Sequence, residues 1–236
     1  MSSIDNIIPE DKWEFDESVA KCFPNMLSRS IPQYEVMRDL SAQLVTDIVN
    51  DNFKILDLGC SDGLMILALD KYLKKTNGQF IGVDVSEPML NKARNIFSNY
   101  TSRIVIENCD LRYDFPKDNY DAITSILTLQ FIPIEYRQKI IQNVYDNLNK
   151  GGVFIFVEKI LGNNNQINEL FVKNYYRLKE HNGYTKEQIE SKRQSLEGVL
   201  VPLTDSSNKE LLYQAGFKTV DTFWKWCNFT GYIVIK

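Results

Sequence analysis

The sequence predicts a doubly wound α/β fold around a mostly parallel sheet, and three observations support this prediction. The chain has 236 residues, of which 44% are hydrophobic and 25% charged, so a single domain over residues 1–236 can bury a full core. Between residues 53 and 158, short apolar runs alternate with helical segments of about 10–15 residues, which is typical of βαβ units. The runs are apolar throughout, as strands buried on both faces of a parallel sheet must be.

Residues 1–50 are predicted to form N-terminal helices. From Trp13 to Leu27, aromatic and apolar residues recur at helix-like spacing, which predicts one or two packed helices. A second helical pattern follows over residues 34–49, with Val36 on its apolar side. We therefore expect these helices to pack against the body of the domain.

The predicted cofactor-binding core, residues 53–158, alternates strands with helices. Ser86 is placed to cap one of these helices, and Pro88 suits its first turn. Other helices are expected at 64–73 and 133–148. The expected strands are 53–58, 79–84, 104–107, 120–127 and 153–158.

After Glu158 the alternation stops. Residues 161–200 are polar, helical in pattern and rich in tyrosine, which predicts a helical insertion. The sheet is expected to resume within residues 217–236, in two final strands. Ligands of open α/β sheets bind at the carboxyl ends of the strands, so we expect the insertion to form a lid over that edge.

Composition argues against several kinds of partner and site. The net charge is −4 and the pI about 5.2, whereas proteins that grip phosphate backbones usually carry a basic face, so no direct nucleic-acid partner is expected. No apolar run approaches the roughly 20 residues that span a bilayer, so no membrane partner is expected. Four cysteines without a CxxC pair and one histidine exclude a CxxC zinc site and a histidine-based metal cluster. The polar residues 1–10 lack a secretory signal, so we expect reduced cysteines and a cytoplasmic protein.

The first predicted strand ends in the glycine motif Asp57-Leu58-Gly59-Cys60-Ser61-Asp62-Gly63. Gly59 and Gly63 let the backbone turn sharply and approach a ligand closely. The dinucleotide and P-loop glycine patterns are both absent. The spacing D-x-G-x-x-x-G resembles motif I of class I methyltransferases, which implies their Rossmann-like, mostly parallel seven-stranded sheet; an ordinary turn is the alternative.

Two further acids follow the next two strands. Asp84 ends the second strand, where a carboxylate can accept hydrogen bonds from both ribose hydroxyls. Asp110 and Leu111 follow the third strand, where class I methyltransferases hold the adenine amino group. Three acids at the ends of successive parallel strands indicate one nucleoside site, and an acidic site suits the sulfonium of S-adenosylmethionine better than a pyrophosphate.

Further motifs lie along nearly the whole chain: Trp13-x-Phe15-Asp16-Glu17, Phe23-Pro24-x-Met26, Arg29-Ser30-x-Pro32-x-Tyr34, Thr128-Leu129-Gln130-Phe131, Glu158-Lys159, Asn182-Gly183-Tyr184 and Lys192-Arg193. Together they resemble a narrower family, the carboxy-S-adenosylmethionine synthases. The resemblance implies binding of S-adenosylmethionine and prephenate and release of phenylpyruvate and carboxy-S-adenosylmethionine. A separate enzyme uses the latter product to modify a tRNA wobble uridine.

The resemblance also assigns roles to individual residues. Arg193 matches a lid arginine that clamps the new carboxylate of the cofactor, a task that suits the planar fork of a guanidinium. Val85 and Ile126 depart from the family, because they stand where it usually carries asparagines, and Ile126 offers no polar side-chain atom. The residues that match cofactor contacts are Tyr34, Gly59, Cys60, Ser61, Asp84, Asp110 and Leu111.

For each of the two arginines proposed for the acid substrate, Arg193 and Arg29, a purely structural role is the alternative. Arg193 can pair with Glu190 or Glu197 on an exposed helix, and Arg29 can form a structural salt bridge. Because of Val85 and Ile126, methyl transfer to a small carboxylate-bearing acceptor is the first functional hypothesis, and carboxy-S-adenosylmethionine synthesis is the alternative. A non-catalytic nucleoside-binding module is the third. The N-terminal helices could also supply a homodimer surface.

Overall fold

A computed structural model describes residues 3–73, 77–100 and 103–236. Residues 1–2, 74–76 and 101–102, which belong to the expected segments 1–50 and 53–158, lie outside the described residues. None of the helices in the described part of the chain is long and apolar enough to cross a membrane.

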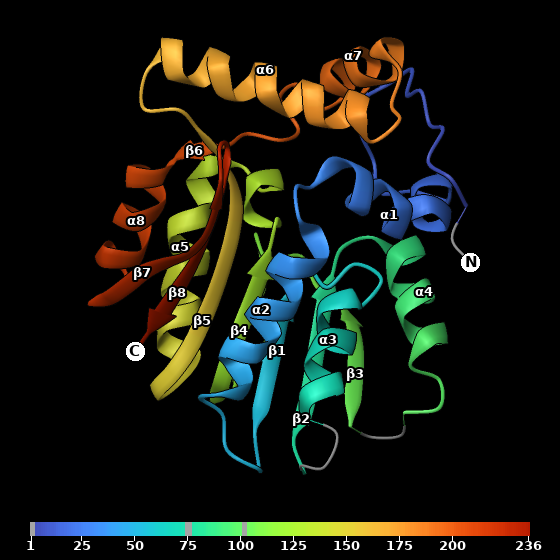
Figure 1. Cartoon of the computed structure of the whole chain (residues 1–236). Helices are drawn as coiled ribbons and strands as arrows, with labels where there is room; N and C mark the ends of the chain where they lie inside the picture. Colours follow the sequence, from blue (N-terminus) through green and yellow to red (C-terminus); the bar gives the residue numbers. More distant parts are fainter. Residues whose placement is uncertain (1–2, 74–76, 101–102) are drawn as a thin grey trace.

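The described residues form one sheet of eight strands (Figure 1). The strands are β1 (Lys54–Leu58), β2 (Gln79–Asp84), β3 (Ile104–Asn108), β4 (Tyr120–Ile126), β5 (Leu148–Leu161), β6 (Leu203–Thr204), β7 (Thr219–Trp226) and β8 (Phe229–Ile235). Seven of them follow the order β3-β2-β1-β4-β5-β8-β7, and the two-residue β6 pairs with β5. β1 to β5 pair in parallel and β8 is antiparallel to both neighbours, which confirms the predicted doubly wound, mostly parallel sheet.

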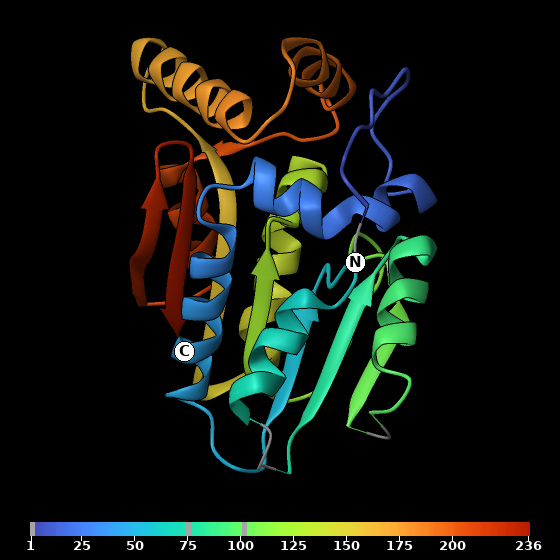
Figure 2. The same cartoon turned by 45° about the vertical axis from the view of Figure 1, so that its right-hand side comes forward.

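The helices cover both faces of this sheet (Figures 1 and 2). They are α1 (Glu17–Ser30), α2 (Tyr34–Thr46), α3 (Leu64–Leu73), α4 (Glu87–Ile96), α5 (Ile134–Asn147), α6 (Asn165–His181), α7 (Lys186–Ser195) and α8 (Asp205–Gln214), with a 3₁₀ turn η1 (Leu129–Phe131). Side chains of α2, α3 and α4 share one apolar core with the sheet, and those of α5 and α8 share the other. Burial on both faces is the reason why the core strands lack polar alternation.

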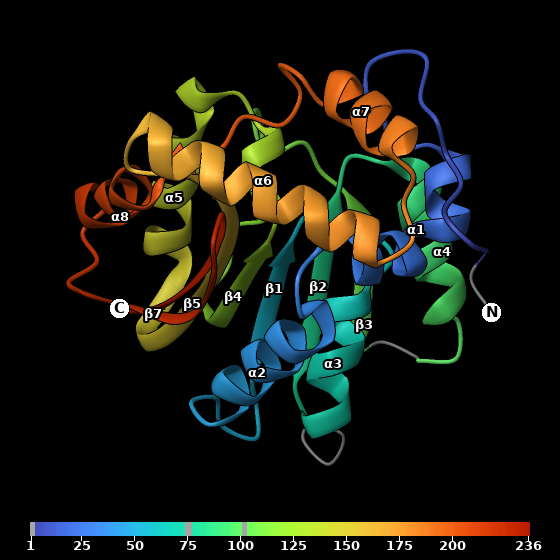
Figure 3. The same cartoon turned by 45° about the horizontal axis from the view of Figure 1, so that its top comes forward.

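α6 and α7 lie across the carboxyl ends of the parallel strands (Figure 3). Both helices have side-chain caps: Asn164 accepts from Ile167 N at 2.9 Å, and Thr185 forms a reciprocal capping box with Gln188. The segment expected as a lid over residues 161–200 therefore consists of two separately capped helices.

Two details of the predicted N-terminal helices are wrong. α1 begins only at Glu17, capped by Asp16, and Trp13 lies outside the helix, where its backbone N–H donates to Ser195 O at 3.0 Å. Trp13 thus packs against the lid instead of continuing a helix. Val36 is exposed, because α2 turns a different face, which includes Met37, toward the core.

The bounds of one predicted strand differ from those of β5, and the structure contains one further helix, α8. The strand expected at 153–158 extends over Leu148–Leu161, since Leu148 still pairs with Tyr120 across an irregularity, although polar residues and glycines interrupt the apolar run. α8 was not predicted, yet Thr204 caps it by accepting from Ser207 N at 3.1 Å.

Candidate active site

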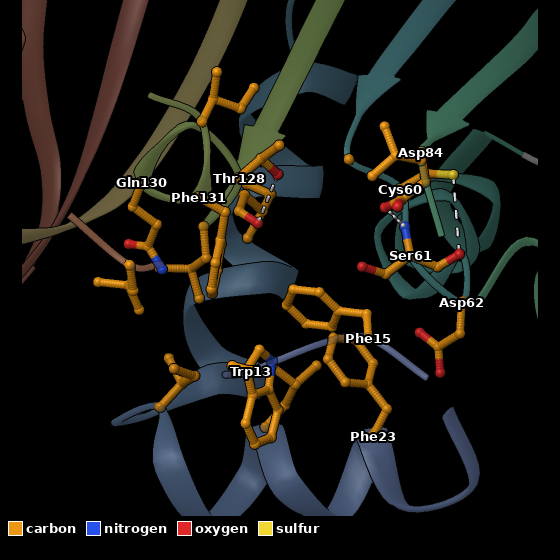
Figure 4. Close-up of a pocket in the computed structure, with 18 of the residues that line it drawn as sticks. Trp13, Phe15, Phe23, Cys60, Ser61, Asp62, Asp84, Thr128, Gln130 and Phe131 are labelled. Atoms are coloured by element: carbon orange, nitrogen blue, oxygen red, sulfur yellow. Dashed lines mark hydrogen bonds between the residues drawn. The ribbon is translucent and has the colours of Figure 1, made fainter. Parts of the chain in front are cut away.

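A cavity of about 430 Å³ opens at the carboxyl ends of β1, β2 and β4, below the lid. This position is the topological switch point of the sheet, where the chain order reverses on either side of β1. Figure 4 shows Trp13, Phe15 and Phe23 on one side, facing the glycine loop and Asp84 on the other. The N-terminal segment, the cofactor core and the lid thus all contribute to the cavity wall.

The glycine loop after β1 is held tightly against its neighbours. Gly59 has φ +71°, and its amide donates to Val83 O at 2.8 Å. A Cβ atom at position 59 would lie 2.3 Å from Oγ1 of Thr128, which itself donates to Leu58 O at 2.9 Å. Only glycine fits this close approach, so the backbone of the glycine loop itself lines the cavity at this position.

Asp84 joins the glycine loop to the start of α4. Its carboxylate accepts from Ser61 N at 3.0 Å and from Ser86 N at 2.9 Å. Burial raises the pKa of Asp84, and the two backbone amides oppose that increase. Each carboxylate oxygen keeps capacity for one more hydrogen bond, so the group is placed to accept from two neighbouring hydroxyls of a ribose.

The other two strand-end acids are in different surroundings. Asp57 is buried and accepts from Thr124 Oγ1 at 2.6 Å, and burial, with a smaller contribution from Asp84, raises its pKa to about 7. The Asp110 carboxylate is already engaged by Arg112, whose Nε lies 2.9 Å from Oδ1, and this contact lowers the pKa of Asp110. An adenine amino group at Asp110 would share the carboxylate with Arg112.

Most residues predicted for the cofactor lie together on the cavity wall, but Gly63 and Arg193 do not. Gly63 has φ +81°, and a Cβ atom there would lie 2.4 Å from the ring of Phe97, so this glycine shapes the start of α3. The residues on the wall are Tyr34, Asp57, Gly59, Cys60, Ser61, Asp84, Val85, Asp110, Leu111 and Ile126.

Neither arginine expected to be catalytic lines the cavity. The Arg193 side chain is 45% exposed and donates to both Glu190 carboxylate oxygens, at 2.7 and 3.0 Å, which matches the exposed-helix alternative. Arg29 donates to Asn182 O at 2.9 Å and to Asp5 O at 2.7 Å, and its guanidinium stacks 3.9 Å from the Tyr184 ring centroid. In this structure Arg29 ties the N-terminal segment to the lid.

Four charged residues on the wall were not predicted as site residues: Asp62, Arg112, Lys179 and Lys192. Asp62 is 1% exposed, and its Oδ2 forms an ion pair with Lys92 Nζ at 2.9 Å. Asp62 Oδ1 has no hydrogen-bond partner among the described residues, and neither has the nearby Nε of Arg38. The positions of Asp62 inside the glycine motif and of Lys192 beside Arg193 were usable signals, whereas nothing near Lys179 in the sequence marked it as part of a site.

The unpartnered oxygen of Asp62 on the cavity wall suits the ammonium group of S-adenosylmethionine. A carboxylate and an ammonium group form a charge-assisted hydrogen bond, which would satisfy this buried oxygen. Arg38 Nε also lacks a hydrogen-bond partner among the described residues, but Arg38 does not line the cavity. Together with Asp84 and the glycine loop, the cavity wall offers groups for the ammonium group and the ribose hydroxyls of this cofactor.

Comparisons with known proteins identify the domain and the fold. Residues 55–152 match the family model described as a methyltransferase domain. The carbon methyltransferase CurJ aligns with a TM-score of 0.67 and 14% identity over 93% of this chain and 61% of its own. Phosphoethanolamine N-methyltransferase 2 of Haemonchus contortus, solved with S-adenosyl-L-methionine, aligns with a TM-score of 0.61 and 14% identity over 85% of this chain and 52% of its own. The chain therefore contains a methyltransferase domain and has the fold of class I methyltransferases.

Curated relatives narrow this class. The carboxy-S-adenosyl-L-methionine synthase of Methylococcus capsulatus is 37% identical over 228 residues, which cover 96% of this chain and 94% of the relative. The synthase of Staphylococcus epidermidis is 40% identical over 226 residues, covering 95% and 97%. The chain belongs to the carboxy-S-adenosyl-L-methionine synthase family.

Proposed function

We propose that this enzyme makes carboxy-S-adenosylmethionine from S-adenosylmethionine and a carboxylate donor, which the family resemblance identifies as prephenate. Prephenate gives up its carboxyl group and its hydroxyl and leaves as phenylpyruvate, and the hydroxyl departs as water with the proton lost from the methyl group. The observation that carries the proposal is the extent of the relationship. The relatives with this name match 95–96% of the chain, whereas the general methyltransferase model matches only residues 55–152. The additional matched parts are the N-terminal segment and the lid, which supply the outer wall of the cavity.

Different residues of the cavity wall bind different parts of the cofactor. Asp84 accepts from the ribose hydroxyls, Asp110 and Leu111 hold the adenine, and Asp62 and Tyr34 face the amino-acid end. The bound cofactor supplies a methyl group activated by the adjacent sulfonium. These contacts fix the position of that methyl group, and alignment of the reacting groups is the main contribution such an enzyme makes.

The aromatic wall and the lid exclude water from the reacting carbon. Trp13, Phe15 and Phe131 form edge-to-face contacts, with Phe15 5.1 Å from Phe131 and 6.1 Å from Trp13 between ring centroids. Exclusion of water matters because a proton from water would compete with the carboxyl group for the reacting carbon.

Methyl transfer to a small carboxylic acid is a second candidate, and a specific observation favours it. Ile126 lines the cavity where the family usually carries an asparagine, and Val85 stands at a second such position with its side chain largely exposed. A lost polar contact leaves its partner unpaired unless the site has changed. In this candidate the cavity aligns the acceptor, the methyl carbon and the sulfur in line.

We further propose a cytoplasmic enzyme that acts on a small-molecule acid and not directly on nucleic acid. Its product would supply a separate enzyme that modifies a tRNA wobble uridine. The net charge of −4 supports the absence of direct nucleic-acid binding. A homodimer built on the N-terminal helices is also proposed, and light scattering at several concentrations tests it.

Mass spectrometry of the nucleoside that copurifies with the protein is the first test of function. We expect S-adenosylmethionine with one hydrogen replaced by a carboxyl group, and we expect the purified enzyme to form it from S-adenosylmethionine and prephenate. S-adenosylhomocysteine with a methylated acid would instead establish methyl transfer. Cofactor binding without turnover on prephenate and a panel of acids would establish a non-catalytic nucleoside-binding module. The Asp84→Asn variant, weakened in cofactor binding, is the control for contaminating activity.

A further inference from the structure

Two lysines of the lid are buried at the cavity. Lys179 of α6 is 5% exposed and Lys192 of α7 is 3% exposed, and both line the cavity wall. Lysine is almost never fully buried without a partner, because removing an ammonium group from water is costly. Each of these lysines is therefore expected to have an anionic group beside its ammonium group.

Lys192 has its anion within the chain. Its Nζ lies 2.5 Å from Oδ2 of Asp5, which is fully buried and also accepts a hydrogen bond from the Tyr184 hydroxyl. The other carboxylate oxygen of Asp5 accepts from Ile7 N at 3.1 Å. The Asp5 carboxylate is thus occupied by its own neighbours.

Lys179 has no such partner. Among residues 3–73, 77–100 and 103–236, its Nζ forms no hydrogen bond or ion pair, and its polar surroundings are the ring faces of Tyr175 and Tyr184, at 5.4 and 5.3 Å. Lys159 of β5 is a second cation nearby, 4.7 Å from the Tyr175 ring. A cation–π contact stabilises an ammonium group less than a full counter-ion does.

The charges around Lys179 are mostly of its own sign. Lys192, Lys159 and Arg29 approach it from α7, β5 and α1, and Asp5 is the acid that opposes them. Burial and these cations lower the pKa of Lys179 to about 7. An anion that enters the cavity would compensate this excess of positive charge.

We propose that Lys179, supported by the Asp5–Lys192 pair, is the anion subsite of the cavity and binds a carboxylate of the acid substrate. The inference rests on the proposed function, since it assigns the substrate contact of the same cavity. Arg193 and Arg29, the arginines predicted for the acid substrate, do not line the cavity. The aromatic wall of the same cavity suits a ring-bearing carboxylate better than a phosphate, which needs several donors.

The test is calorimetric binding to the full-length protein in the presence of S-adenosylhomocysteine, with prephenate, phenylpyruvate, benzoate and neutral benzamide as probes. We compare wild type with Lys179→Met, Lys179→Arg and the control Lys173→Met, an exposed lysine of the same helix. Loss of a charge-assisted contact should weaken acid binding about ten- to hundredfold in Lys179→Met. Lys179→Arg should stay within a few-fold of wild type, because it keeps the charge.

A second readout separates this role from a purely structural one. Affinity for S-adenosylhomocysteine should be unchanged in Lys179→Met, and so should benzamide binding, since neither needs the ammonium group. Unchanged acid affinity in Lys179→Met would overturn the proposal, as would an equal loss of acid, benzamide and nucleoside affinity.

The same experiment distinguishes this inference from the proposed function. If wild type binds phenylpyruvate or benzoate in a Lys179-dependent manner but not prephenate, the anion subsite stands and the proposed donor is wrong. If wild type binds the nucleoside but none of the acids, the anion subsite is overturned.

Discussion

The buried pair of Asp5 and Lys192 allows a double-mutant cycle. Its side chains are 0% and 4% exposed, and Asp5 belongs to the N-terminal segment while Lys192 belongs to the lid. Removing one partner leaves the other buried and unpaired, which costs about 3–5 kcal/mol in comparable buried pairs. We therefore expect Asp5→Asn and Lys192→Met each to lower the free energy of unfolding by about that amount.

The double variant should lose much less than the sum of the two single losses. No isolated charge remains in it, and well-packed uncharged side chains can replace a buried ion pair at little cost. Urea denaturation followed by circular dichroism measures the three free energies, and the coupling energy should exceed about 1 kcal/mol. Asp11→Asn, at an exposed position of the same segment, is the control and should change stability by less than about 0.5 kcal/mol.

The structure also predicts how a weakened pair would show locally. Asp5 lies in the segment that precedes α1, so undocking of that segment sets an upper limit to the measured loss. Limited proteolysis should then cut the single variants faster than wild type before residue 13. Single losses below 1 kcal/mol that add without coupling, together with unchanged proteolysis, would refute the burial of this pair.

Three further predictions concern the cavity. Gly59→Ala should destabilise the protein by at least about 1–2 kcal/mol, because the backbone at Gly59 has φ +71° and the added Cβ would meet Thr128. The same change should weaken S-adenosylhomocysteine binding in calorimetry. Unchanged values would contradict the close approach. Asp84→Asn should weaken the same binding about ten- to hundredfold, since the ribose loses a charged acceptor, and an unchanged affinity would remove Asp84 from the ribose site. The folded chain lowers the pKa of Lys179 from 10.5 to about 7, so between these values the unfolded state binds more protons and stability rises with pH. Urea denaturation from pH 6 to pH 9 measures the free energy of unfolding of both proteins. That of wild type should rise relative to that of Lys179→Met by at most about 1.4 kcal/mol per pH unit, and a constant difference would show that Lys179 titrates normally.

Local patterns in the sequence determined the sheet and the glycine loop of the cofactor site. Strands such as 79–84 were predictable because burial on both faces demands an unbroken apolar run. The glycine motif was predictable because Gly59 and Asp84 must follow strands whose ends meet at the same edge. These requirements involve short segments, so they leave a mark in consecutive residues.

Tertiary packing decided which charged side chains reach the cavity. Lys192 and Arg193 are neighbours in the sequence, but one residue of α7 rotates the side chain by about 100°, so only Lys192 points inward. Its partner Asp5 is 187 positions away, and no local pattern connects the two. The sequence alone therefore predicted a lid and a nucleoside site, whereas the docking of the N-terminal segment against α7 determined where the buried cations lie, because it is this contact that removes water from them.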